Sequence, residues 1–166
     1  MKLSKRSIFI IVLIVFNIAI DQISKFWVRA NVEAKTASSI FGDFFTLHNV
    51  ENSGAFLGIG SDLNPIVKLI VLLILPVLVL GWVLRHVFKE TEMDRWSLVG
   101  FCCIIGGGFA NVFDRIVYGS VTDFWHIDLG GVFRTGIFNV ADVSVTTGMI
   151  MLLISSLTNR KKSENA

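Results

Sequence analysis

The sequence predicts an all-α membrane protein with four transmembrane helices and a small β-rich element on its outer surface. Of the 166 residues, 53% are hydrophobic and 17% are charged, whereas soluble domains average about 45–50% and about 25%. Four apolar runs each have the roughly 20 residues needed to cross the hydrocarbon core of a bilayer. These runs cover residues 7–28, 66–84, 96–117 and 138–157. The length favours one integral membrane domain over residues 1–166.

The first apolar run allows two interpretations. A basic segment over residues 1–6 followed by an apolar stretch is also the pattern of a secretory signal peptide. The run continues instead into Asp21, Lys25 and Trp27, without the small residues of a cleavage site. We therefore expect a retained anchor helix whose aromatic residues lie at the outer membrane boundary.

The second run is the most uniformly apolar, with Lys68 near one end and Pro76 inside it. Proline is tolerated in membrane helices and bends them. The third run contains the two cysteines, Cys102 and Cys103, which are adjacent and surrounded by apolar residues. We expect both to pack in the helix, because neither a disulfide framework nor a metal site fits this spacing.

The distribution of Lys and Arg predicts the orientation. Nine of the 15 lie in the two termini and the middle connection, and three lie in the other two connections. The positive-inside rule therefore places both termini in the cytoplasm. On the opposite, outer side, residues 40–50 and 131–138 are rich in aromatic and β-branched side chains. Both segments are expected to form short strands of a small sheet at the membrane surface.

With this orientation, the polar residues of three helices gather near the outer leaflet. Ionisable side chains at membrane depth cost about 2.5–3.5 kcal/mol each, so they normally face a cavity or a partner. The first helix supplies Asp21 and Lys25, the third supplies Asn111, Asp114 and Arg115, and the fourth supplies Asn139 and Asp142. Asp21 with Lys25, and Asp114 with Arg115, fit either structural ion pairs or a functional site. The residues alone leave both interpretations open.

Asp123 and Asp142 differ from these because neither has a cationic neighbour in sequence. Asp142 could favour the positive end of a helix dipole, and Asp123 could be an ordinary loop residue. If the two carboxylates meet, like charge and burial would make the pair share one proton near neutral pH. Aspartic proteases use such a pair to activate water and polarise the scissile carbonyl.

Four motifs resemble those of the bacterial lipoprotein signal peptidases, also called type II signal peptidases. Residues 106–115, with Asp123 and Phe124 after them, resemble the third-helix signature of that family. Residues 138–142 resemble its fourth-helix motif, residues 21–25 its D-x-x-S/T-K pattern, and residues 52–55 its N-x-G-A loop. The four matches follow the order of the family and cover the chain from the first helix to the fourth.

The resemblance implies a catalytic dyad of Asp123 and Asp142. It also implies pocket positions at Asp21, Lys25, Asn52, Gly54, Asn111, Asp114, Arg115, Asn139 and Ala141. Two residues depart from the family pattern. Ala110 stands where glycine is usual, and Val143 stands where serine is common. Ser144 cannot replace that serine, since it lies about 100° further round the helix.

The implied activity is that of an aspartic endopeptidase without metal or cofactor. Such an enzyme removes the signal peptide of diacylglyceryl-modified prolipoproteins, cutting just before the lipidated cysteine. The implied location is the bacterial cytoplasmic (inner) membrane, with the site near the outer leaflet. Implied partners are prolipoproteins, membrane lipids and cyclic-peptide inhibitors of the globomycin type, with no nucleic acid. We expect Asn111 and Arg115 to donate hydrogen bonds to the substrate backbone, because they lie one turn apart.

Two other classes of function compete with this one. A carrier would need polar residues along a path through the bilayer, or near its midplane with inverted repeats. A structural subunit would use the charges only for assembly. The inner halves of all four predicted helices are almost free of ionisable groups, which disfavours a carrier.

Overall fold

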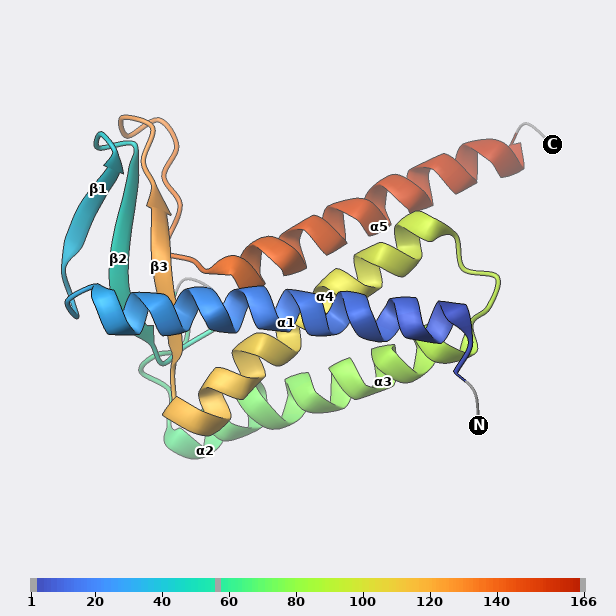
Figure 1. Ribbon diagram of the computed structural model, residues 1–166, viewed down its shortest axis with the longest axis horizontal. Helices are drawn as coiled ribbons and strands as arrows, with labels where there is room; N and C mark the ends of the chain where they lie inside the picture. Colours follow the sequence, from blue (N-terminus) through green and yellow to red (C-terminus); the bar gives the residue numbers. More distant parts are fainter. Residues whose placement is uncertain (1–2, 56–57, 165–166) are drawn as a thin grey trace.

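The computed structural model describes residues 3–55 and 58–164 of the chain. Its elements are α1 (Lys5–Asn31), β1 (Ala37–Phe41), β2 (Phe45–Asn52), α2 (Pro65–Lys68), the π-helical segment η2 (Leu69–Ile74), α3 (Leu75–Lys89), α4 (Arg95–Tyr118), β3 (Val121–Ile127) and α5 (Val140–Glu164). Figure 1 shows the helices bundled together, with the three strands standing at one end. We call this the sheet end.

Four helical stretches are long and apolar enough to cross a membrane, which confirms the predicted fold class. They cover Lys5–Asn31, Pro65–Lys89, Arg95–Tyr118 and Val140–Asn159. The first helix begins where the Ser4 hydroxyl accepts a hydrogen bond from the backbone N–H of Ser7. It continues through Arg29, beyond the end predicted at residue 28. The last residues of this helix include polar side chains, so the apolar pattern ends before the helix does.

Pro76 explains the irregular second span. A proline inside a helix has no N–H to donate, and its ring crowds the carbonyl group four residues earlier. Directly before it, residues Leu69–Ile74 form a π-helical segment, in which Leu75 donates its N–H to the carbonyl of Ile70. The wider turn accommodates the proline without ending the helix.

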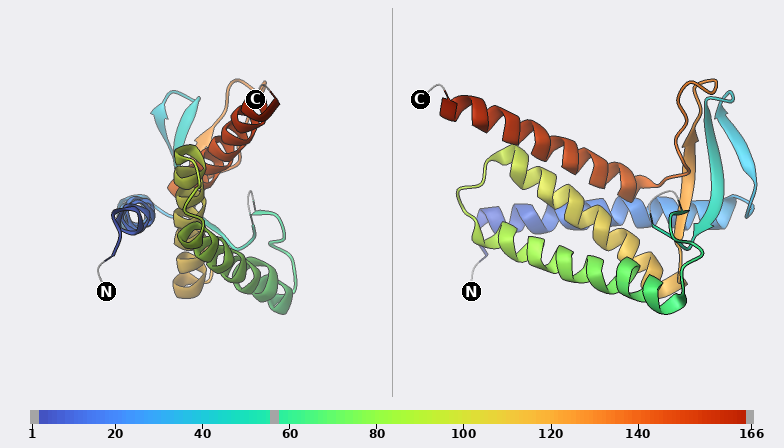
Figure 2. Two further views of the ribbon diagram at one scale, coloured as in Figure 1. Left: turned by 90° about the vertical axis from the view of Figure 1, so that its right-hand side faces the viewer. Right: turned by 180° about the vertical axis from the view of Figure 1, so that it is seen from behind.

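α4 is the central helix and contacts α1, α3 and α5. Figure 1 and the right-hand view of Figure 2 show α3 and α5 on either side of α4, which crosses between them. The crossing of α4 with α5 depends on Gly107, where a Cβ atom would lie 2.4 Å from the carbonyl oxygen of Ala141. Small residues allow such close approach in membrane bundles. The apolar core lies in the half of the bundle away from the sheet end. It includes Cys102, as predicted for a packing cysteine.

The strands form one antiparallel sheet in the order β1-β2-β3, which corrects the predicted strand positions. Residues 40–50 are not one strand, because Gly42 adopts φ 56° and turns the chain between β1 and β2. Residues 131–138 make only single bridges, at Arg134 and Phe138. The third strand is instead Val121–Ile127, the stretch that contains Asp123.

The sheet end is also where the polar residues gather. β3 follows α4 directly after Gly119, whose φ of 78° ends that helix, and leads towards the start of α5. Both chain termini lie at the opposite end of the bundle (Figure 1). The fold therefore brings the C-terminal ends of α1 and α4, the start of α5 and strand β3 together.

Candidate active site

Asp123 lies in the middle of β3, opposite Val50 of β2, and is 3% exposed. Its two carboxylate oxygens accept hydrogen bonds from two asparagine side chains. Asn139 donates to Oδ1 at 2.6 Å, and Asn52 donates to Oδ2 at 2.9 Å. Both partners are neutral amides, and no Lys or Arg of the described residues forms an ion pair with this carboxylate.

Asp142 lies in the first turn of α5, next to the same asparagine. The backbone N–H of Asn139 donates to Oδ2 of Asp142 at 3.1 Å, and the backbone N–H of Asp142 donates to the Asn139 side chain at 3.0 Å. These two reciprocal hydrogen bonds form a capping box. Asp142 is therefore also placed favourably at the start of its helix, as the sequence predicts. Asn111 donates to Oδ1 of Asp142 at 3.0 Å. Asn139 thus contacts both carboxylates and brings the two predicted catalytic residues together.

Each of the three amides is held in one orientation by a donor that cannot act as an acceptor. The Asn52 oxygen accepts from the N–H of Gly54 at 2.9 Å, and the Asn139 oxygen accepts from the N–H of Asp142. The Asn111 oxygen accepts from the ammonium group of Lys25 at 2.8 Å. Because each oxygen is occupied in this way, each NH2 group is directed to an aspartate.

Asp21 and Lys25 of α1 and Asp114 of α4 form a separate charge cluster, and all three are fully buried. The Lys25 ammonium contacts Asp21 at 2.7 Å, Asp114 at 2.8 Å and the Asn111 oxygen, so all three of its donors are used. Arg29 lies 3.3 Å from the other oxygen of Asp114. Two acids and two bases balance one another. Asp21 and Lys25 thus form the ion pair that their spacing predicts, and Lys25 also links the cluster to Asn111.

Asp114 and Arg115 do not pair with each other, contrary to one of the two predicted alternatives. Successive residues of a helix point about 100° apart, so Asp114 faces α1 while Arg115 faces the chain after β2. Arg115 donates to the carbonyl of Gly54 at 2.8 Å and to the carbonyl of Asn111 at 3.2 Å. Gly54 is required there, because a Cβ atom would lie 2.6 Å from the carbonyl oxygen of Gly58.

Ala141 contributes through its backbone. Its N–H donates to Oδ1 of Asp21 at 2.8 Å, which ties the start of α5 to the charge cluster on α1. The neighbouring Ser144 turns away from Asp142 and bonds to Asn17 at 2.6 Å. Ser144 therefore does not replace the serine that is common in the family where this chain has Val143, as predicted from its position on the helix.

Three polar residues of this region were not predicted as site residues from the sequence. Gln22 donates to Asp114 at 3.0 Å, and the backbone N–H of Thr122 donates to the same carboxylate at 3.4 Å. Arg29 donates to Thr122 at 2.7 Å and lies over the ring of Tyr118. The signal for Arg29 was its spacing of four residues from Lys25, which puts both on one helix face.

Burial and, to a smaller extent, the negative charge of Asp142 together raise the pKa of Asp123 to about 7, while hydrogen bonds from Asn52 and Asn139 oppose the shift. A cavity of about 300 Å³ reaches this carboxyl group. It is lined by Val50, Glu51, Asn52, Ser53, Gly58, Ser61, Asp123, Gly136 and Ile137. A carboxyl group that exchanges a proton near neutral pH beside a second carboxylate is suited to general acid–base catalysis.

Comparison with known proteins shows the family to which the chain belongs. A family model described as signal peptidase (SPase) II matches residues 12–158. The chain belongs to the signal peptidase II family. It is therefore a peptidase, which displaces the carrier and structural-subunit alternatives.

Lipoprotein signal peptidases of several bacteria are similar to this chain over most of its length. The lipoprotein signal peptidase of Borrelia turicatae is 34% identical and covers 99% of this chain and 96% of its own. That of Clostridium novyi is 31% identical and covers 91% of this chain and 99% of its own. Two solved bacterial membrane enzymes have the same fold, with TM-scores of 0.80 at 24% identity and 0.76 at 26% identity. They cover 93% and 90% of this chain, and 90% and 92% of their own.

Proposed function

We propose that this signal peptidase II family member removes the signal peptide of diacylglyceryl-modified prolipoproteins, cutting just before the lipidated cysteine. Asp123 and Asp142 are the catalytic pair. The observation that carries this proposal is that both carboxylates bond to one residue, Asn139, and that amides rather than cations solvate them. The wall of the adjoining cavity includes Asp123, which gives a peptide access to this member of the pair.

The reaction follows from one proton shared by the pair. The ionised carboxylate accepts a proton from water, and the water oxygen attacks the scissile carbonyl carbon. The protonated carboxyl group donates to the carbonyl oxygen as the tetrahedral intermediate forms. The C–N bond then breaks as the cysteine nitrogen takes a proton from the pair, a hydroxyl group of the intermediate returns a proton to the pair, and the signal peptide leaves with a new carboxyl group. The proton belongs to the dyad as a unit, so acid and base roles are not assigned to single residues.

Arg115 is the better of the two expected donors to the substrate. A guanidinium group has five N–H donors, and Arg115 uses two bonds, to Gly54 and Asn111. Asn111 is bonded at both ends of its amide, to Lys25 and to Asp142. We therefore assign Asn111 to holding Asp142 and Arg115 to binding the substrate or the developing oxyanion.

We propose that the protein lies in the bacterial cytoplasmic membrane with both termini in the cytoplasm and the sheet end at the outer leaflet. The common side of the two termini (Figure 1) and the excess of Lys and Arg there support this orientation. A lipidated cysteine at the outer boundary would then meet the dyad directly. A cyclic peptide of the globomycin type is expected to inhibit by occupying the cavity beside Asp123.

The test uses the purified protein in nanodiscs with two synthetic peptides that differ only in the diacylglyceryl group on cysteine. Mass spectrometry of the products is expected to show one cut, before the lipidated cysteine, and far slower cleavage of the unmodified peptide. A chelator is expected to leave the rate unchanged. Equal cleavage of both peptides, or a cut at another bond, would overturn the assignment of substrate.

A further inference from the structure

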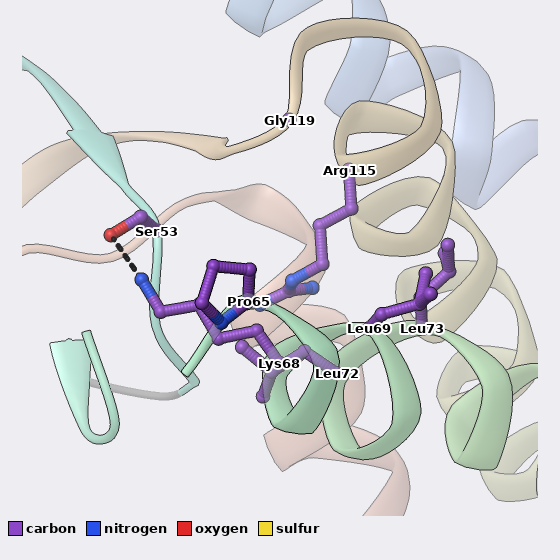
Figure 3. Close-up of a pocket in the computed structure, with 8 residues that line it drawn as sticks. All are labelled: Ser53, Pro65, Lys68, Leu69, Leu72, Leu73, Arg115 and Gly119. Atoms are coloured by element: carbon purple, nitrogen blue, oxygen red, sulfur yellow. Dashed lines mark hydrogen bonds between the residues drawn. The ribbon is translucent and has the colours of Figure 1, made fainter. Parts of the chain in front are cut away.

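A second cavity, of about 350 Å³, lies between the end of α4 and the start of the second membrane span. It is lined by Ser53, Pro65, Lys68, Leu69, Leu72, Leu73, Arg115 and Gly119. Figure 3 shows Lys68 reaching Ser53 from one side and Arg115 descending from α4 toward the same space. Two cationic side chains therefore face one cavity whose floor is made of leucines.

Among the residues that the structure describes, no carboxylate lies within 4.0 Å of Lys68 or Arg115. The ammonium of Lys68 makes a single long contact, of 3.5 Å, to the hydroxyl of Ser53. This differs from Lys25 and Arg29, which each contact a buried carboxylate. The charge of Arg115 interacts at longer range with Asp123, Asp142 and Asp114, so Lys68 is the cation of this cavity that lacks a carboxylate partner among the described residues.

The position of Lys68 is unfavourable for stability, which indicates another role. It lies in the first turn of the continuous helix Pro65–Lys89. The N-terminal end of a helix is the positive end of its dipole, where cations are disfavoured. A half-buried lysine there, at the membrane boundary, needs an anionic partner from outside the chain.

We propose that this cavity binds the phosphate of an anionic phospholipid from the leaflet at the sheet end. Lys68 and Arg115 contact the phosphate oxygens, and Ser53 donates a hydrogen bond. An acyl chain runs over Leu69 and Leu73. Charge complementarity supports this occupant, because phosphate oxygens accept strong hydrogen bonds from ammonium and guanidinium groups. Basic pockets between membrane helices are a known form of lipid headgroup site.

The bound headgroup would also act on the chain segment that holds the dyad. Ser53 lies between Asn52, which bonds to Asp123, and Gly54, whose carbonyl accepts from Arg115. A phosphate bridging Ser53, Lys68 and Arg115 would fix this segment. We therefore expect anionic lipid to raise activity as well as to bind. The binding itself goes beyond the proposed function and does not depend on it.

Binding is tested with a photoactivatable phosphatidylglycerol and a matching phosphatidylcholine probe in nanodiscs of phosphatidylcholine. We expect the phosphatidylglycerol probe to label the helix around residues 69–73 and the phosphatidylcholine probe to label it about fivefold less. Lys68→Gln is expected to abolish this preference, Lys68→Arg to keep it, and Lys89→Gln, at the other end of the same span, to leave it unchanged. Equal labelling by both probes, or an unchanged preference in Lys68→Gln, would overturn the proposal. Displacement by inorganic phosphate would overturn the lipid as its occupant.

Activity gives a second, separate measurement. Added phosphatidylglycerol is expected to stimulate cleavage by the unaltered protein and not by Lys68→Gln. In neutral detergent without lipid, the two proteins are expected to have equal rates. A loss of activity there would place Lys68 in the substrate site and reject a lipid site. Photolabelling needs no catalysis, so the lipid site is decided even if the proposed cleavage fails.

Discussion

Two groups of buried carboxylates lie side by side at the sheet end, and they differ in what solvates them. Asp21 and Asp114 contact the Lys25 ammonium at 2.7 and 2.8 Å, with exposed fractions of 0%. Asp123 and Asp142 accept only from amides and backbone N–H groups among the described residues. The first pair is charge-balanced and ties helices together. The second pair retains the freedom to take up and release a proton.

Under the proposed function, the same residue type serves two purposes within one membrane site. A cation in contact holds a carboxylate ionised, which suits a structural cluster. Amide donors orient a carboxylate and leave its charge unneutralised. Lys25 belongs to both groups, because it balances Asp21 and also fixes the amide of Asn111. Stability and catalysis are therefore separable in most of these residues and coupled in Lys25.

The largest effect is expected from neutralising the amide-solvated pair. Asp123→Asn or Asp142→Asn removes one partner of the shared proton, and general acid–base catalysis contributes about 10² to 10⁴-fold. We expect the cleavage rate of a lipidated substrate to fall by about 10³-fold or more. The unfolding temperature is expected to change little, since amide and carboxyl have similar shape. Near-normal turnover in either variant would reject the dyad.

Breaking the charge-balanced group is expected to act on stability instead. Asp114→Asn leaves Lys25 and Arg29 with one acid, and removing one partner of a buried ion pair costs about 3–5 kcal/mol. Unfolding in detergent measures this loss. The control is Asp128→Asn, which removes an exposed pair with Arg134, whose side chain is 69% exposed, so a change below about 1 kcal/mol is expected. Equal losses in both variants would contradict the comparison.

A geometric change at Gly54 is expected to weaken catalysis without touching either group directly. A Cβ atom in Gly54→Ala would lie 2.6 Å from the Gly58 carbonyl oxygen, so the segment must shift. Misplacement by about 1 Å costs up to about 10²-fold in rate, and we expect a loss of this order in kcat/KM. The control Gly81→Ala has nothing within 4 Å of the added Cβ and is expected to keep full activity.

The pH dependence gives the smallest expected effect. The pKa of Asp123 is raised to about 7 by burial, so the dyad keeps its proton below that pH and loses it above. The cleavage rate is therefore expected to fall about tenfold per pH unit on the alkaline side. Recovery on return to lower pH separates loss of the proton from unfolding. A rate that stays constant well above pH 7 would show that no shared proton is needed.

The sequence carried enough information to predict the four helical spans and to name the candidate site residues. Hydrophobic length alone predicts the four spans, because the bilayer demands it. The strands were harder to predict, because Gly42 divides one apolar segment into two strands and Thr122 and His126 interrupt the apolar pattern of β3. Arg29 was missed because the apolar run ends before it. Pairing such as that of Asp114 with Lys25 depends on how helices cross, which spacing within one helix does not reveal.

The most direct test of the central claim is an infrared titration of the protein in nanodiscs across neutral pH. Our account predicts a protonated-carboxyl band that disappears with a midpoint near pH 7 and is absent from Asp123→Asn and from Asp142→Asn. Asp128→Asn is expected to keep the band. A spectrum without any protonated carboxyl group below pH 7, or a band that survives both dyad substitutions, would contradict the shared proton.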